Sequence, residues 1–165
     1  MSENLMQENF IYKLLQYISE NNPDLLVQLE ENGEVTSYLS EKIKSVSSIL
    51  NRENQPSYVI EQTSMDALTQ DLRPSRYNYI CKILEEEFPT TYRQLHETGI
   101  LRFEAINLIE YCHQVFEAMH FSEANEDNML LYYAIAGSIG EYFDKVTSEN
   151  ETVSNGLQQP TEITG

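Results

Sequence analysis

The most constraining feature of this sequence is the spacing of its apolar residues, which recur every three or four positions along most of the chain. Between residues 35 and 50 they form one stripe: Val35, Leu39, Ile43, Val46 and Leu50. This spacing places all five side chains on one face of an α-helix, where other helices can bury them. No segment shows the sustained two-residue alternation of a β-strand. The sequence therefore predicts an all-α fold, a multihelical bundle of about six to seven helices.

Residues that start or stop helices mark the boundaries of this pattern. Pro23 interrupts the first apolar segment, and Gly33 predicts a break before the second. Pro56 suits the first turn of the third helix, Ser75 suits the cap of the fourth, and Gly99 suits the end of the fifth. The expected helices cover residues 10–18, 35–50, 57–72, 76–88, 90–99, 101–119 and 129–146.

The expected organisation is a single all-helical domain over residues 1–146, followed by a tail. A hinge near Pro89 is the place where the bundle could divide into two halves. After Val146 the chain is polar, acidic and nearly free of large apolar residues, which is typical of segments that cannot form a core. Residues 147–165 are therefore predicted to form a disordered acidic tail.

Acidic residues far outnumber basic ones. The chain holds 27 Asp and Glu against ten Lys and Arg, a formal net charge of −17, and no basic cluster occurs. Because nucleic acids and anionic membranes attract cationic proteins, direct binding to either is not expected. Residues 103–165 carry 11 acids and one base, Lys145, so the acidity increases toward the C-terminus. A basic protein partner is favoured, since surfaces of opposite charge attract each other.

Three features predict a cytoplasmic protein. The first ten residues contain acids and no basic region of the kind that begins a signal peptide. The longest apolar stretch, residues 129–140, is too short to span a bilayer. Cys81 and Cys112 lie in helical segments and are expected to be reduced core thiols, because two cysteines in a chain of this length do not make a disulfide framework.

The segment "EYCHQVFEAMH" contains Glu-x-x-His twice, as Glu110 with His113 and as Glu117 with His120. In ferritin-like bundles such motifs bind paired metal ions, but they lie on different helices that face each other. Here both lie in one expected helix, where the two glutamates are about 10 Å apart along the axis. A smaller metal site is the alternative, with Glu117 joined by His113 or His120 and completed by another helix. The favoured interpretation is a solvated edge of His–Glu pairs, with no metal and no other cofactor.

Two other patterns, Cys112 with His113 and Gly137 with Gly140, resemble motifs for catalysis and for ligand binding. Adjacent residues on a helix diverge by about 100°, so Cys112 and His113 cannot act as nucleophile and base. Gly137 and Gly140 do not fit a phosphate-binding loop. Close packing of another helix at Gly140 and Ala136 is expected instead, and a ligand against the bare backbone is the alternative.

The tyrosines and one run of acids are further candidates for a contact surface. Of 11 tyrosines, two neighbouring pairs give one inward and one sideways ring each, namely Tyr77 with Tyr79 and Tyr132 with Tyr133. Half-buried tyrosine is typical of interfaces and also of an ordinary core edge. The run Glu85–Glu87 ends a helix, where carboxylates oppose the helix dipole, and is interpreted as a solvated run or a contact site.

Two C-terminal segments, "LIEYCHQVFEAMHFSE" and "LLYYAIAGSIGEYF", resemble the C-terminal half of a small uncharacterised bacterial family. That family is described only as a domain of unknown function and is found in gut Bacteroidetes, often near conjugative or mobile elements. The segments "YKLLQYISENNPDL" and "EEEFP" are also similar to it, so the resemblance covers most of residues 10–144. It implies a multihelical fold and a cytoplasmic protein, and it implies no activity and no catalytic residue.

These observations predict a non-enzymatic, acidic protein-interaction module whose partner is a basic protein. In the specific form of this hypothesis, the chain is an accessory protein of a mobile element that imitates the charge of nucleic acid and occupies a DNA-binding protein. The alternative is an enzyme that binds a metal or a small ligand along the helix edge of His113, Glu117 and His120. The oligomeric state is not predicted.

Overall fold

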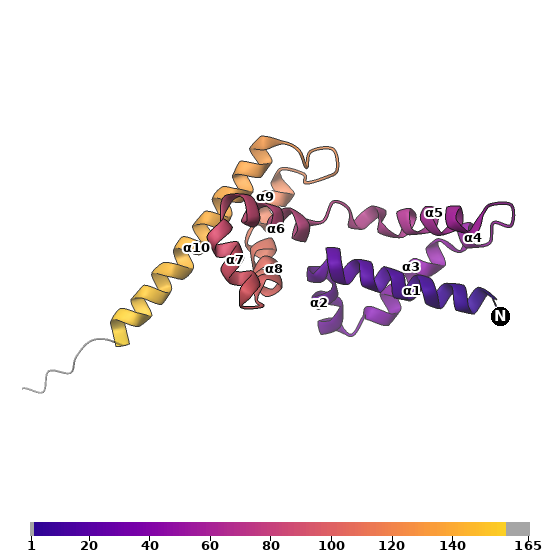
Figure 1. The fold of residues 1–165 in the computed structure, drawn as a ribbon, viewed down its shortest axis with the longest axis horizontal. Helices are drawn as coiled ribbons and strands as arrows, with labels where there is room; N and C mark the ends of the chain where they lie inside the picture. Colours follow the sequence, from indigo (N-terminus) through magenta and orange to yellow (C-terminus); the bar gives the residue numbers. More distant parts are fainter. Residues whose placement is uncertain (1, 158–165) are drawn as a thin grey trace, which may run out of the picture. The chain divides into compact units, whose positions relative to one another are not determined.

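The computed structural model describes residues 2–157, and these residues are almost entirely helical (Figure 1). They form ten α-helices and one short 3₁₀-helix, and no β-strand occurs between residues 2 and 157. The predicted all-α class is confirmed, and the number of helices is higher than predicted. The elements are α1 (Ser2–Asn21), α2 (Pro23–Asn32), α3 (Val35–Ser45), α4 (Ser47–Leu50), α5 (Ser57–Thr69), η1 (Gln70–Leu72), α6 (Arg76–Glu87), α7 (Pro89–Glu97), α8 (Leu101–Tyr111), α9 (His113–Ala118) and α10 (Met129–Leu157).

Two expected helices are each divided by a single residue. Val46 separates α3 from α4 with φ −107° and ψ 10°, and Cys112 separates α8 from α9 with φ −88° and ψ 3°. Both side chains are buried. Because the spacing of the apolar residues continues through each break, the sequence pattern gives no sign of it. The additional helix α2 begins at Pro23, at a first-turn position that tolerates proline.

The chain forms two compact units, Met1–Ile109 and Glu110–Gly165, which we call unit 1 and unit 2. The boundary between them falls in the last turn of α8. Pro89, where the sequence suggested a hinge, is the first residue of α7 and lies inside unit 1. There α7 packs against α6, the helix that precedes it in the chain.

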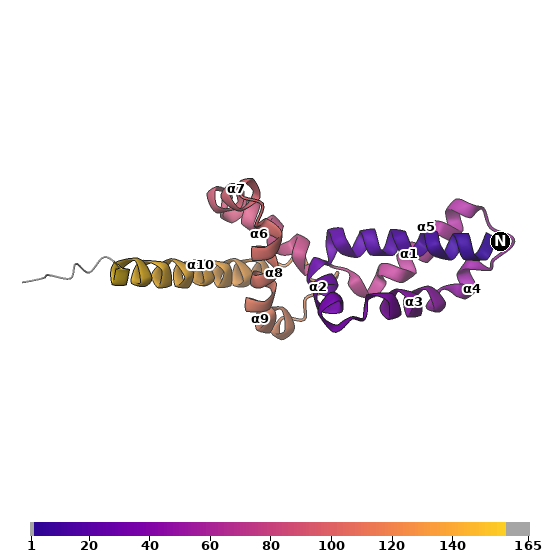
Figure 2. The ribbon, with the colours of Figure 1, turned by 90° about the horizontal axis from the view of Figure 1, so that it is seen from below.

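The N-terminal helices of unit 1 bury one apolar core. Helix α1 contacts α2, α3 and α5, and Figure 2 shows α1 and α3 running alongside each other. A fully buried leucine or isoleucine contributes roughly 1.5–3 kcal/mol to folding, so this core supplies much of the stability of these helices. Its buried members are Phe10, Leu14, Ile18, Leu26, Leu39, Ile43, Val46, Leu68 and Leu72.

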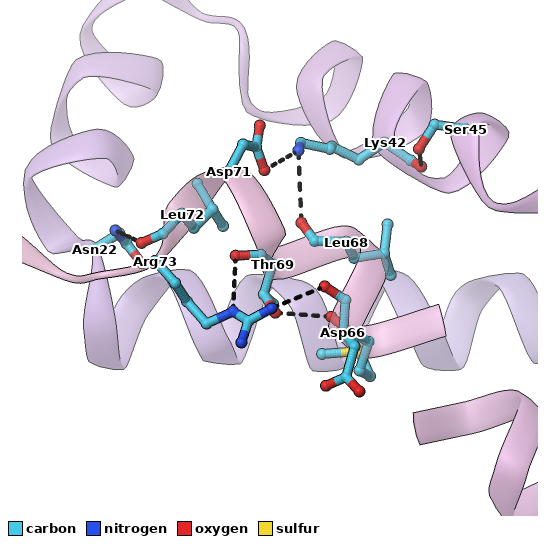
Figure 3. A network of polar contacts seen from close by, with 10 residues as sticks. Asn22, Lys42, Ser45, Asp66, Leu68, Thr69, Asp71, Leu72 and Arg73 are labelled. Carbon is cyan, nitrogen blue, oxygen red and sulfur yellow. Dashed lines mark hydrogen bonds and ion pairs between the residues drawn. The ribbon is translucent and has the colours of Figure 1, made fainter. Parts of the chain in front are cut away.

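Polar side chains close one end of this core (Figure 3). Lys42 donates to the carbonyl oxygen of Leu68 at 3.5 Å and forms an ion pair with Asp71. Asn22 donates its side-chain amide to the carbonyl oxygen of Leu72 at 3.1 Å. The last carbonyl groups of a helix have no partner within it. Side chains of α3 and of the α1–α2 junction therefore satisfy the end of the α5–η1 segment.

Three boundary residues that the sequence predicted are confirmed. Gly33 and Gly99 follow α2 and α7 in the left-handed conformation, with φ 68° and 74°, which glycine adopts without a side-chain clash. Ser75 caps α6, because its hydroxyl oxygen accepts a bond from the Asn78 N–H at 3.0 Å. The same hydroxyl donates to the carbonyl oxygen of Asn21, and this bond joins the end of α1 to the start of α6.

Unit 2 contains α9, a polar loop and α10. The side chain of Asn125 organises the loop, since its amide donates to the carbonyl oxygen of Met119 at 2.8 Å and its oxygen accepts from the Ser122 N–H at 2.8 Å. The side-chain oxygen of Asn128 accepts from the Leu130 N–H at 2.8 Å, which places a cap at the start of α10.

Helix α10 extends beyond its predicted end. It continues through residues 147–157, which the sequence assigned to a disordered tail, and residues 158–165 of that tail lie outside the described residues. Extending a formed helix requires no new nucleation, and no proline occurs between the start of α10 and Pro160. Among residues 2–157, no helix combines the length and apolar character needed to cross a membrane.

Candidate interaction surface

The residues of the two Glu-x-x-His motifs are all exposed and belong to different elements. Glu110 lies in the last turn of α8, His113 and Glu117 lie in α9, and His120 follows α9 with a left-handed φ of 54°. Among the described residues, no group of three or more His, Cys, Asp or Glu side chains could hold a metal ion. Within residues 2–157, the structure therefore does not bring His113, Glu117 and His120 together as a set of metal ligands.

Both cysteines are free thiols in buried or half-buried positions. Burial raises the pKa of Cys112 to about 12. Burial also raises the pKa of Cys81, and a hydrogen bond from the Tyr77 hydroxyl only partly offsets this. Because the thiolate is the reactive form, both cysteines are protonated and unreactive at neutral pH. The prediction that Cys112 is a core residue is confirmed.

The acidic run at the end of α6 borders a shallow pocket. The pocket has a volume of about 350 Å³ and lies between the end of α6 and one face of α7. Its walls combine carboxylates with cationic or titratable bases, so it presents no single charge to a ligand. The lining residues are Glu85, Pro89, Tyr92, Arg93, His96 and Glu97.

Unit 2 carries a strongly acidic surface. Residues 110–150 contain eight acids, all exposed, and one base, Lys145, which gives a formal net charge of −7. The ammonium group of Lys145 lies 5.2 Å from the centroid of the Tyr111 ring. A hydrogen bond to the Tyr111 hydroxyl raises the pKa of Lys145. We call the eight acids the acidic surface: Glu110, Glu117, Glu123, Glu126, Asp127, Glu141, Asp144 and Glu149.

The outward face of α10 places apolar groups beside these acids. Leu130 is 75% exposed and Tyr133 is 59% exposed, although the same helix buries Leu131 and Ile135 completely. One turn after Tyr133, a Cβ built on Gly137 would meet nothing within 4 Å. Leu130, Tyr133 and Gly137 therefore form one exposed row on the side of α10 opposite its buried residues, and we call it the α10 outer row.

The sequence pattern did not reveal this row. Residues 129–136 are apolar on every side, so helical periodicity cannot distinguish the buried face from the exposed one. Tyr132 is half-buried and Tyr133 is exposed, as the sequence suggested for one inward and one sideways ring. Ala136 and Gly140, where close packing was expected, are half-buried, whereas Gly137 is exposed.

Comparison with known proteins identifies one match. Residues 6–147 match the family model DUF1896, described as a domain of unknown function. The comparisons with curated proteins and with solved structures found no match.

Proposed function

Since the chain belongs to the DUF1896 family, a domain of unknown function, we propose its role from its surface: it is a non-enzymatic interaction module that binds a basic protein. The observation that carries this proposal is the acidic surface of unit 2, where eight exposed acids stand against one lysine. A surface of one charge attracts a partner of the opposite charge and accelerates their encounter.

The state of Lys145 supports the proposal. This lysine is the only base among residues 103–165, and its ammonium group lies over the Tyr111 ring in a hydrogen bond with the hydroxyl. Its interactions with Tyr111 keep this cation on the ring. The carboxylates of Glu141 and Glu149 also raise the pKa of Lys145. One cation against eight acids leaves a net negative charge that attracts Lys and Arg side chains of another protein.

The proposal has a finer form, in which the partner is a DNA-binding protein and the chain serves a mobile element. A row of exposed carboxylates presents negative charge to a cationic site as phosphates do. The chain would then occupy the nucleic-acid site of its partner. Duplex DNA would compete with the chain for that partner.

A pull-down with the immobilised full-length chain tests the proposal. Proteins retained from a lysate of the native host are identified by mass spectrometry after washes at low and at high salt. We expect a basic protein that is lost at high salt, because the screening length falls from about 10 Å at 0.1 M to about 3 Å at 1 M. Added duplex DNA should release the same protein if the finer form is correct.

Two variants with equal net charge make the test specific. Replacing Glu126, Asp127, Glu141 and Asp144 by Gln or Asn removes four charges from the acidic surface, and this variant should lose the partner. Replacing four exposed glutamates of unit 1 by Gln removes the same charge elsewhere, and this variant should keep it. Equal retention by both variants would show that the acidic surface is not the binding site. The control positions are Glu8, Glu30, Glu31 and Glu41.

A further inference from the structure

The α10 outer row exposes helix backbone at Gly137 beside two large apolar side chains. Glycine inside a helix lowers helix stability relative to alanine, and at Gly137 no neighbouring atom would contact an added Cβ. Leu130 exposes a large apolar side chain two turns before it, and Tyr133 exposes one a single turn before it. Open backbone next to exposed apolar side chains is the arrangement that lets a second helix approach closely.

Acids bracket this row at both of its ends. Glu126 and Asp127 precede α10, while Glu141 and Asp144 follow Gly137 on the same face. At about 100° per residue, the row and the two later acids fall within a sector of roughly 80°. The distance from residue 130 to residue 144 along the axis is about 21 Å. Along the chain, two acids therefore precede the apolar row, and two acids that share its face follow it.

This order of charged and apolar groups determines which kind of molecule can bind to the α10 outer row. A second copy of the chain would bring its own bracketing acids against these acids in either orientation, and like charges repel. An anionic membrane is repelled for the same reason. A short amphipathic helix with Lys or Arg at both ends of an apolar stretch matches both the charges and the apolar row.

We infer that the α10 outer row is the docking site for a basic amphipathic helix of a partner protein, which crosses α10 at Gly137. The inference rests on the proposed function and names the part of the acidic surface that recognises the partner. The apolar row fixes the position of the partner helix, and the four bracketing acids fix its ends.

A synthetic peptide provides a defined probe. It is a fluorescently labelled helix of about 14 residues, the length that spans about 21 Å, with leucines along one face and two lysines at each end. One control peptide has serine in place of each leucine, and another has glutamate in place of each lysine. Binding to the full-length chain is measured by fluorescence anisotropy. We expect only the first peptide to bind well.

The decisive variant is Gly137→Leu. The added side chain has free space in the folded chain and raises helix propensity, so the thermal stability should not fall. It occupies the place where the partner helix approaches, and the affinity for the peptide should fall by about tenfold or more. The control is Ala67→Leu, which adds bulk at an exposed position of α5 and should leave the affinity unchanged.

The outcomes separate this inference from the proposed function. If the serine peptide binds as well as the leucine peptide and Gly137→Leu has no effect, binding is electrostatic only: the inference is overturned and the proposed function stands. If sedimentation shows a dimer that Gly137→Leu dissociates, a second copy covers the row and the inference is overturned. If no peptide binds and the pull-down retains no basic protein, both are wrong.

Discussion

The N-terminal helices of unit 1 and the helices of unit 2 use charged residues in different ways. In unit 1, Lys13 pairs with Glu61 and Lys42 pairs with Asp71, and each pair joins two different elements. In unit 2, the single lysine lies over the ring of Tyr111, and the same unit exposes eight acids between residues 110 and 150. Partly exposed ion pairs add little to stability, so their main effect in unit 1 is to balance charge between helices.

The same contrast applies to apolar residues. The N-terminal helices of unit 1 direct their apolar stripes into one core, with Leu14 and Ile18 almost completely inaccessible. Helix α10 buries one apolar face and exposes Leu130 and Tyr133 on the other. An apolar face that is left exposed beside a net negative charge is typical of a surface that contacts another molecule. Unit 1 also exposes large apolar side chains, among them Tyr12 and Phe103, so unit 2 differs from it in the excess of acids that lie near its exposed apolar groups.

The largest expected effect comes from comparing a buried leucine, Leu14, with an exposed leucine, Leu130. Leu14→Ala removes a side chain with no exposed area and should lower the free energy of unfolding by about 2–5 kcal/mol. Leu130→Ala makes the same chemical change at a 75% exposed position and should stay within about 0.5 kcal/mol of the wild type. Urea denaturation followed by circular dichroism measures both. Equal losses would show that α10 buries Leu130 in solution.

A smaller effect is expected in the loop that holds the start of α10. Asn125→Ala leaves the carbonyl oxygen of Met119 and the N–H of Ser122 without their side-chain partner, which should cost about 1–3 kcal/mol. Thermal unfolding reports the loss, and faster amide hydrogen exchange in the loop would locate it. Asn54→Ala, at an exposed position of another loop, is the matched control. A loop that exchanges at the wild-type rate would contradict the assigned role.

The smallest expected effect is a change in the pKa of Lys145. The hydrogen bond to Tyr111 raises the pKa of Lys145 above its ordinary value of 10.5. The folded chain thus holds this proton more tightly than the unfolded chain, so the stabilisation is complete below the ordinary pKa and is lost as the pH rises through the folded pKa. Tyr111→Phe removes the hydroxyl and should lower the pKa of Lys145, measured by NMR titration of the lysine side chain.

The control for this titration is Tyr58→Phe, because Tyr58 is 70% exposed and lies in unit 1. This variant should leave the pKa of Lys145 unchanged. An unchanged pKa in Tyr111→Phe would show that the lysine is not bound to Tyr111, and that it is available to pair with the acidic surface. The contrast in charge between the two units would then be weaker.

Some features of the protein follow from its sequence alone because they depend on neighbouring residues in the chain. The helical spacing of apolar residues predicts the all-α class, and Ser75, Gly33 and Gly99 mark helix ends through local backbone chemistry. The burial of Cys112 follows from its place in the middle of an apolar face. The argument against a dinuclear metal site at Glu110, His113, Glu117 and His120 assumed one continuous helix, and the break at Cys112 shows that this assumption was wrong.

Other features were decided only by the tertiary structure. The breaks at Val46 and Cys112 preserve the apolar spacing, so no local signal marks them. The bond between Ser75 and Asn21 joins residues that are 54 positions apart. The exposed face of α10 could not be chosen from a segment that is apolar on every side, because burial depends on which neighbouring helices pack against it. The candidate interaction surface therefore became visible only when the fold showed which side of α10 remains uncovered.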